Sequence, residues 1–254
     1  MSERRLLLRQ ISTEIPVRTS GRVLVGIDGV DGSGKTLFAA ALAAELRRQG
    51  RSVVVLHADD FLNPRAVRHR LGRASPEGFF LDSYDYDALE REVLVPLGPG
   101  GDGRYRPASL DLERDVRITP EVRVVDERAV AILEGLFLHR DRLESRWDYS
   151  VFLDAPFPVT VQRVSGRDGT LADPHHTDLR RYVEGQRVYF RSCNPWLRAD
   201  RVVDNSDLDR PRILSKEEVS SLSSERLGAQ AASGSGRSDA CTTTSEDTAR
   251  VRQT

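Results

Sequence analysis

Three glycines within eight residues, at positions 29, 32 and 34, are the feature that most restricts what this chain can fold into. Residues 22–28 before them form a short run with several β-branched side chains, which predicts a strand. Residues 35–49 after them carry alanine and leucine at helical spacing until Gly50, and a second β-branched run follows at 52–56. Strand, glycine loop, helix and strand form a βαβ unit, so the chain needs a sheet with helices packed against it.

The rest of the chain continues this alternation of strands and helices. Residues 129–133 and 149–153 are apolar runs of strand length, and a last strand is expected at 201–203. Helices are expected at 156–166 and 178–192. Apolar runs of this kind are typical of parallel strands that are covered on both faces. The sequence therefore predicts an α/β fold, with a doubly wound parallel sheet in a three-layer sandwich.

Two stretches interrupt the pattern. Residues 63–85 are rich in Arg, Gly, Pro and Ser without clear periodicity, so we expect a surface excursion there, followed by a helix at about 87–95. Residues 96–107 are rich in glycine and proline, which indicates a break before a hairpin or strand near 108–118.

Composition divides the chain into one domain with two flanking segments. We assign residues 21–214 to the domain and residues 1–20 to an N-terminal extension, whose apolar cluster could form a helix packed on the domain. Residues 215–254 are rich in Ser, Thr, Gly and mixed charges and contain few large apolar side chains. Such a segment buries too little apolar surface to offset the entropy of ordering, so we expect a disordered tail.

Charge and cysteine content narrow the choice of partners. The formal net charge is -1, with arginine spread among the acidic residues, so neither nucleic acid nor an anionic membrane is an expected partner. The two cysteines, Cys193 and Cys241, form neither a disulfide framework nor a zinc site, and no run of eighteen apolar residues occurs. We expect a cytoplasmic protein, and the sequence leaves open whether it forms a homo-oligomer.

The glycine loop has the chemistry of a phosphate site. It follows the pattern Gly-x-x-x-x-Gly-Lys-Ser/Thr, in which backbone N–H groups surround phosphate oxygens, Lys35 reaches the β- and γ-phosphates and Thr36 binds Mg²⁺. Lysine occurs only at Lys35 and Lys216, so its retention in the loop indicates a need for an ammonium group. An accidental glycine-rich turn is disfavoured by the flanking strand and helix. We expect ATP and Mg²⁺ to bind through the whole loop: Gly29, Val30, Asp31, Gly32, Ser33, Gly34, Lys35 and Thr36.

The glycine loop alone does not indicate a kinase, because switches, motors and ATPases share it. Evidence for an acceptor of the phosphate comes from the end of the second strand. Asp59 and Asp60 follow that strand, where a carboxylate would lie beside the γ-phosphate and could orient a hydroxyl and accept its proton. The alternative is that both acids merely begin a solvated loop.

Together these motifs resemble those of the P-loop small-molecule kinases, which include uridine kinase, phosphoribulokinase, nicotinamide riboside kinase and bacterial pantothenate kinase. Among these kinases, the motifs of uridine kinase resemble those of this sequence most. The resemblance covers about residues 20–206 and implies the nucleoside-kinase-like type of P-loop NTPase fold. It rests on the glycine loop and on four further motifs: Asp59-Asp60-Phe61, Tyr84-Asp85-Tyr86-Asp87-Ala88-Leu89, Leu133-Glu134-Gly135, and Arg163 with Arg167-Asp168.

The resemblance also implies roles for particular residues. Asp59, the first acid of the Asp-x-Phe motif, would be the catalytic base, acting with Lys35. Glu134 would hold Mg²⁺ together with Thr36, directly or through water. Asp85 would bind ribose-like hydroxyls and Tyr105 would line the acceptor pocket. Arg163 and Arg167, four residues apart on one helix, would clamp the transferring phosphate, although an ordinary solvated arginine face is an equal alternative.

In the family, the helix with these two arginines belongs to a lid over the phosphate, and this chain departs from the family pattern there. Uridine kinases usually carry a further Arg-Gly-Arg after the arginine helix, whereas residues 169–177 here read otherwise, so a shorter lid is expected. We therefore predict ATP-dependent phosphorylation of a small hydroxyl-bearing metabolite, a nucleoside such as uridine being the first choice. The alternatives are a kinase for another small alcohol, such as a riboside, a pantothenate-like compound or an antibiotic, a regulatory nucleotide-binding module without an acceptor, and a relic without catalysis.

Overall fold

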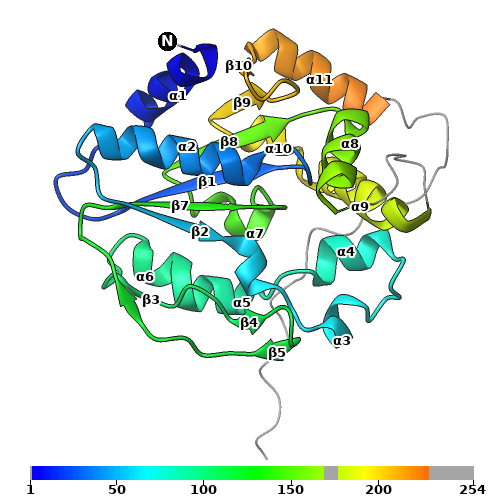
Figure 1. The fold of residues 1–254 in the computed structure, drawn as a ribbon, viewed down its shortest axis with the longest axis horizontal. Helices are drawn as coiled ribbons and strands as arrows, with labels where there is room; N and C mark the ends of the chain where they lie inside the picture. The colour runs from blue at the N-terminus through cyan, green and yellow to red at the C-terminus, as the bar shows by residue number, and fades with distance from the viewer. Residues whose placement is uncertain (1, 169–176, 229–254) are drawn as a thin grey trace, which may run out of the picture.

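A six-stranded sheet forms the centre of the computed structural model, which describes residues 2–168 and 177–228 (Figure 1). Its strand order is β10-β9-β8-β1-β7-β2. Within this sheet, neighbouring strands are parallel except at one edge, where β10 pairs with β9 in the antiparallel sense. The strands are β1 (Val23–Gly29), β2 (Val53–His57), β7 (Val130–Gly135), β8 (Tyr149–Asp154), β9 (Arg201–Asp204) and β10 (Arg212–Ile213).

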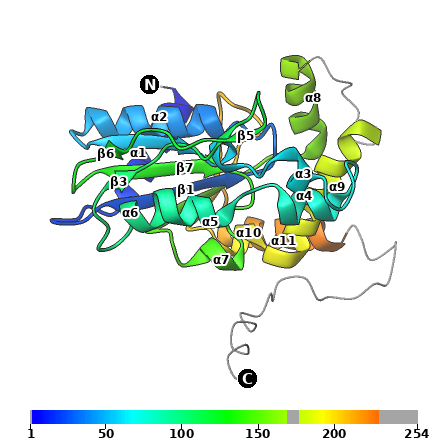
Figure 2. The ribbon, with the colours of Figure 1, turned by 90° about the horizontal axis from the view of Figure 1, so that it is seen from below.

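Helices cover both faces of this sheet (Figure 2). One face packs against α1 (Glu3–Glu14) and α2 (Lys35–Arg48), whose apolar side chains share a core with the side chains that point to that face. The other face packs against the helices of the middle and later parts of the chain, including α7 (Asp141–Glu144) and α10 (Pro195–Arg198). The predicted three-layer α/β fold with a doubly wound sheet is confirmed.

The region expected to be an excursion contains two helices. They are α3 (Arg65–Arg68) and α4 (Pro76–Asp82), and Ser75 caps α4 by accepting a 3.0 Å hydrogen bond from the N–H of Gly78. Phe79 and Phe80 of α4 are buried against α9 (Thr177–Cys193). The excursion prediction was wrong for α4 because a seven-residue helix is too short to display a clear period.

The following segment is close to its prediction. Three helical pieces run on without a break: α5 (Tyr86–Leu89), the π-helical η2 (Glu90–Leu94) and α6 (Val95–Leu97). The expected hairpin is present as β4 (Leu110–Asp111) and β5 (Val116–Arg117). A second small pair, β3 (Arg104–Tyr105) with β6 (Arg123–Val124), was not predicted, since two-residue strands have no periodicity to detect.

The two flanking segments also form helices. The N-terminal segment contains α1, which buries Leu7, Leu8 and Ile11 in the core. The expected disordered tail begins instead with α11 (Lys216–Gly228), where Leu222 is buried, while residues 229–254 lie outside the described part. Helix α8 (Phe157–Asp168) precedes the other undescribed segment. No helix within residues 2–168 or 177–228 has both the length and the apolar character needed to cross a membrane.

Candidate active site

The glycine loop joins the end of β1 to the start of α2, as predicted. Gly32 and Gly34 have φ angles of 76° and 90°, in the left-handed region that favours glycine. A Cβ atom on Gly32 would lie 2.4 Å from the carbonyl oxygen of Thr160, and one on Gly34 would lie 2.9 Å from Nδ2 of Asn205. Both glycines are therefore required by backbone angle and by space, and they leave the first N–H groups of α2 available at the loop.

Three side chains from distant parts of the chain hold the loop from outside. Gln186 of α9 accepts a 2.8 Å hydrogen bond from the N–H of Asp31. Asn205, which follows β9 and is buried, donates to the carbonyl oxygen of Ser33 at 2.6 Å. Arg163 of α8 donates to the carbonyl oxygen of Gly32 at 3.3 Å. The loop is thus fixed by α8, α9 and β9 as well as by its own strand and helix.

Lys35 and Thr36 lie at the start of α2, and Glu134 at the end of the neighbouring strand β7. The Lys35 ammonium donates to the carbonyl oxygen of Val30 at 2.9 Å, which holds it over the loop. The Thr36 hydroxyl donates to Oε1 of Glu134 at 2.9 Å. The structure therefore brings together the two residues that were predicted to share a metal ion.

His57 is a member of this group that the sequence analysis did not assign. It lies opposite Glu134 in the β2–β7 register, and its Nδ1 is 2.7 Å from the same Oε1. Burial alone would raise the pKa of Glu134, but the hydrogen bonds from His57 and Thr36 and the charge of Lys35 bring that pKa below its ordinary value. The hydrogen bond to Glu134 raises the pKa of His57 despite partial burial. Glu134 is thereby kept as a carboxylate.

Close packing explains why a glycine, Gly135, follows Glu134. A Cβ atom on Gly135 would lie 2.4 Å from Cβ of Ala58, the residue after β2. Any larger residue at this position would force the end of β7 away from the short helix η1 (Ala58–Phe61). The Glu-Gly pair thus combines a carboxylate with a close approach of the two strand ends.

Asp59 and Asp60 lie in η1, directly beyond β2, and have different surroundings. The buried hydroxyl of Tyr84 donates to Oδ1 of Asp59 at 2.7 Å, while the Asp59 residue itself is exposed. Burial of Asp60 raises its pKa, as do the charges of Asp59 and Glu134, although the charge of His57 opposes this. Of the two acids, Asp59 is therefore the one whose carboxylate oxygen is held by a hydrogen bond from Tyr84. Its role as the catalytic base stays a prediction.

Asp85 and Tyr105 are the predicted acceptor-binding residues, and the N–H of Asp85 donates to the carbonyl oxygen of Phe61 in η1 at 2.8 Å. Asp85 caps α5, since its Oδ1 accepts a 3.0 Å hydrogen bond from the N–H of Ala88, and its Oδ2 pairs with Arg117. Burial would raise the pKa of Asp85, but the Arg117 guanidinium and the Ala88 N–H bring it below the ordinary value. Both Asp85 oxygens are thus engaged within the protein. Tyr105 is buried in β3. Binding of the acceptor by either residue stays a prediction.

Arg163 and Arg167, the predicted lid arginines, both belong to α8. Besides Gly32, the Arg163 guanidinium donates to the carbonyl oxygens of Asn205 at 3.0 Å and Ser206 at 2.6 Å, and burial lowers its pKa. Arg163 therefore holds the loop through backbone carbonyl oxygens. Its contact with phosphate stays a prediction. The side chain of Arg167 and residues 169–176 of the expected shorter lid lie outside the described structure.

Sequence reasoning missed Gln186 and Asn205, which hold the loop, and His57, which contacts Glu134. Each is polar and lies at a strand end or inside an amphipathic helix, and such positions are common in any α/β chain. Only the strand order and the packing of α9 bring them to the site, so the sequence held no signal that distinguished them from other polar residues.

The fold and this site define a P-loop kinase: a glycine loop opening a helix, with a threonine, a lysine and strand-end carboxylates gathered at one edge of a parallel sheet. No protein-family model matches the chain. A uridine kinase of Klebsiella pneumoniae is 30% identical over 151 residues, which span 58% of this chain and 68% of that protein. A uridine kinase of Yersinia pestis is 29% identical over the same shares. The chain belongs to the uridine kinase family.

Solved structures agree with this assignment. A possible uridine kinase from Bacillus stearothermophilus is 28% identical with a TM-score of 0.61, over 78% of this chain and 96% of that one. A putative fructose transport system kinase from a Silicibacter species is 25% identical with a TM-score of 0.61, over 75% and 95% of the two chains. Phosphoribulokinase from Rhodobacter spheroides, at 18% identity and a TM-score of 0.51, over 74% and 71% of the two chains, shares the fold.

Proposed function

We propose that this kinase transfers the γ-phosphate of ATP to a hydroxyl group of a nucleoside such as uridine, with Asp59 as the general base. The observation that supports it best is the 2.7 Å hydrogen bond from the Tyr84 hydroxyl to Asp59 Oδ1. This contact orients an exposed carboxylate just beyond β2, next to the strand that ends in Glu134. A base must be positioned before it can accept a proton, and Oδ2 of Asp59 is the oxygen proposed to receive it.

The residues at the loop fit a nucleoside triphosphate. The left-handed glycines Gly32 and Gly34 have no space for a Cβ atom, and the buried hydroxyl of Ser33 has no hydrogen-bond partner among the described residues. Lys35 at the loop would add a positive charge to the backbone donors. In the proposed reaction these groups bind and orient the polyphosphate and exclude water from it.

The pair Thr36 and Glu134 fits Mg²⁺. Hydroxyl and carboxylate oxygens are ligands that Mg²⁺ prefers, and the lowered pKa of Glu134 keeps its carboxylate charged. In the part of the chain that is described, no three His, Cys, Asp or Glu side chains form a cluster that could hold a metal. Mg²⁺ usually takes one or two protein ligands beside phosphates and water, and Thr36 and Glu134 would supply such a pair. When bound, the ion would neutralise charge on the phosphate oxygens.

Other acceptors are the competing proposals. The similarity to the putative fructose transport system kinase makes a sugar one alternative, and a riboside, a pantothenate-like alcohol or an antibiotic are others. A regulatory module without an acceptor is disfavoured by membership in a family of kinases. We favour a nucleoside because two of the compared proteins are uridine kinases.

A panel of acceptors tests the proposal. Uridine, cytidine, nicotinamide riboside, fructose and pantothenate would each be supplied with MgATP, and ADP release would be measured above the background without acceptor. The Lys35→Ala variant serves as the inactive control. Phosphorylation of a pyrimidine nucleoside supports the proposal. Activity only with a sugar or with pantothenate would replace the nucleoside, and ADP release that no acceptor increases would reject the acceptor site.

We further propose that the enzyme acts in the cytoplasm. Support comes from its two well-separated cysteines and from its proposed use of ATP. Fractionation of cells with immunodetection of the protein tests this, and recovery outside the cytoplasmic fraction would reject it.

A further inference from the structure

An acidic side chain lies fully buried at the start of the phosphate loop. Asp28, the residue before Gly29, is 0% exposed. A buried acid is costly unless its oxygens are hydrogen-bonded, so its hydrogen-bond partners show what holds it there. An acid at this position therefore has a geometric role if those partners belong to separate parts of the fold.

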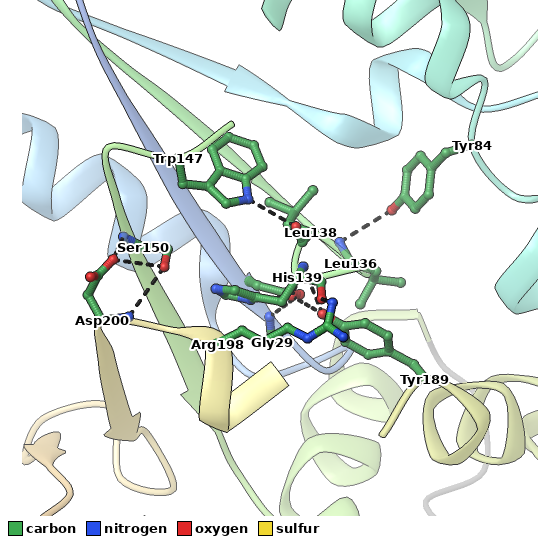
Figure 3. Close-up of polar contacts among 11 residues, drawn as sticks. Gly29, Tyr84, Leu136, Leu138, His139, Trp147, Ser150, Tyr189, Arg198 and Asp200 are labelled. Carbon is green, nitrogen blue, oxygen red and sulfur yellow. Dashed lines mark hydrogen bonds and ion pairs between the residues drawn. The ribbon is translucent and has the colours of Figure 1, made fainter. Parts of the chain in front are cut away.

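The hydrogen bonds of Asp28 have such a geometry. Its Oδ1 accepts from the N–H of Gly29 at 2.7 Å, the first residue of the loop. Its Oδ2 accepts from the backbone N–H of His139 at 3.0 Å, from Nδ1 of the same histidine at 2.8 Å and from the hydroxyl of Tyr189. Figure 3 shows His139 and Tyr189 approaching the start of the loop at Gly29. One carboxylate thus links the loop to α9 and to the segment after β7.

The imidazole of His139 acts here through one nitrogen only. Nδ1 donates to Asp28, whereas Nε2 is buried and has no hydrogen-bond partner among the described residues. A histidine held at Nδ1 by a carboxylate can transfer a proton only if its other nitrogen, Nε2, reaches the reacting group. Burial at 1% exposure and the single contact therefore indicate a donor that holds Asp28.

The segment that carries His139 is itself held rigidly. Trp147 donates to the carbonyl oxygen of Leu138 at 3.0 Å, and Arg198 donates to that of His139 at 3.1 Å (Figure 3). Phe137 has a φ angle of 63°, which is strained for a side chain of this size, and it packs in edge-to-face contact with the ring of Tyr189 at 5.1 Å. Strain that the surrounding packing maintains is typical of functional positions.

The same segment reaches the acceptor side of the site. The N–H of Leu136 lies 3.4 Å from the hydroxyl of Tyr84, which holds Asp59 (Figure 3). Residues 136–139 therefore span from the proposed base to the start of the phosphate loop.

We propose that Asp28, His139 and Tyr189 are positioning residues that set the conformation of the phosphate loop for MgATP. This inference rests on the proposed binding of ATP at the loop. Tyr189→Phe removes one hydroxyl and keeps the ring, and His139→Ala removes the Nδ1 donor. In each variant we expect the Kd of MgATP to rise about tenfold, because Asp28 loses a hydrogen bond that fixes it next to Gly29. The KM of the acceptor should stay within about twofold.

Two further variants separate positioning from general stability. His139→Asn places an amide N–H where Nδ1–H lies, so it should restore the wild-type Kd. Tyr149→Phe is the matched control, because the Tyr149 hydroxyl is hydrogen-bonded at 2.7 Å to a carboxylate, Glu14, that does not contact the loop. This control should leave the Kd unchanged.

The measurements are calorimetric titration with MgATP and hydrogen exchange of residues 29–34 without nucleotide, which should be faster in Tyr189→Phe and His139→Ala. Wild-type Kd and exchange in both variants would overturn the inference, as would an equal effect of Tyr149→Phe or a failure of His139→Asn to rescue. If His139→Ala does not fold, Tyr189→Phe and His139→Asn decide the result. Wild-type protein that binds no MgATP would reject the proposed function, and the exchange data would still decide the inference.

Discussion

Glu134 Oε1 accepts hydrogen bonds from Thr36 and from His57, so one oxygen ties together the ends of β2 and β7 and the first turn of α2. This sharing has a consequence for pH. The pKa of His57 is raised above its ordinary value of 6.5, so its stabilising contribution is complete below that value and is lost as the pH rises through the folded pKa. The pKa of Glu134 is lowered from 4.5, so its contribution is lost only as the pH falls through the folded pKa.

His57→Gln is therefore expected to destabilise the protein most between about pH 4.5 and pH 6.5, where both members of the pair are charged. As the pH rises through the folded pKa of His57 the imidazole loses its charge, so the difference in Tm should shrink toward alkaline pH. Thermal melts of both proteins at pH 5.5 and pH 9 without Mg²⁺ or nucleotide measure this. A Tm difference that grows with pH would contradict the assignment.

Asp59→Asn tests the proposed base at the same scale. The change keeps the shape and removes the charge, so kcat for acceptor phosphorylation should fall by about 10²- to 10⁴-fold. The affinity for ATP, which residues 29–35 determine, should change far less. Steady-state kinetics and ATP titration measure the two effects.

Asp60→Asn is the matched control for that change. The Tyr84 hydroxyl orients Asp59, its hydrogen-bond acceptor, so loss of the charge on Asp60 should affect kcat less than the change at Asp59. If Asp60→Asn were the damaging substitution, the assignment within the pair would be wrong and the kinase would stand. If neither mattered, the acceptor site would lie elsewhere.

At the scale of elements, the N-terminal helix α1 is part of the core rather than an appendage. Ile11 is 0% exposed and packs in the same apolar cluster as Phe38 and Leu42 of α2. The helix begins at a serine cap, since Ser2 accepts a hydrogen bond from the N–H of Arg5.

Ile11→Ala should lower the free energy of unfolding by about 2–5 kcal/mol, the range for truncating a buried isoleucine. Leu6→Ala on the same helix is the control, because Leu6 is 53% exposed, and its effect should stay within about 0.5 kcal/mol. Urea denaturation measures both. Equal, small effects would mean that α1 does not dock in solution.

At the scale of the whole molecule, α9 connects the phosphate loop with α4. Gln186 of this helix holds the phosphate loop, and Gly185, the preceding residue, lies against α4, which ends two residues before Tyr84, the residue that holds Asp59. A Cβ atom on Gly185 would lie 2.7 Å from Cδ1 of Phe79 and 2.8 Å from the carbonyl oxygen of Pro76. The close approach of α9 to α4 therefore depends on this glycine.

Gly185→Ala should force the two helices apart, lower the free energy of unfolding by about 1–3 kcal/mol and raise the KM of the acceptor. Gly166→Ala in α8 is the control, because apart from the backbone of α8 itself no atom of the described residues lies within 4 Å of a Cβ there, so alanine should be neutral or slightly stabilising. Denaturation and acceptor kinetics measure both variants. An unchanged KM and stability in Gly185→Ala would show that the contact can relax without loss.

The sequence alone predicted the phosphate loop, the strands β1, β2, β7, β8 and β9, and the placement of Asp59 and Glu134 at strand ends. These features are local, since a strand, a glycine pattern and a following helix are read within one βαβ unit. The short α4 and the two-residue strands fell below the length at which periodicity is informative. The helix α11 was missed because its composition indicated disorder.

Only the tertiary structure decided which side chains share an oxygen or hold a loop. The meeting of His57 with Glu134 depends on the order of strands in the sheet, and the approach of Gln186 and Tyr189 to the loop depends on how α9 packs. Such contacts join residues far apart in the chain, and one sequence gives no information on which distant polar residues will face each other. The positions of the local motifs could therefore be predicted from the sequence, whereas the contacts that support them were determined by the packing of the whole chain.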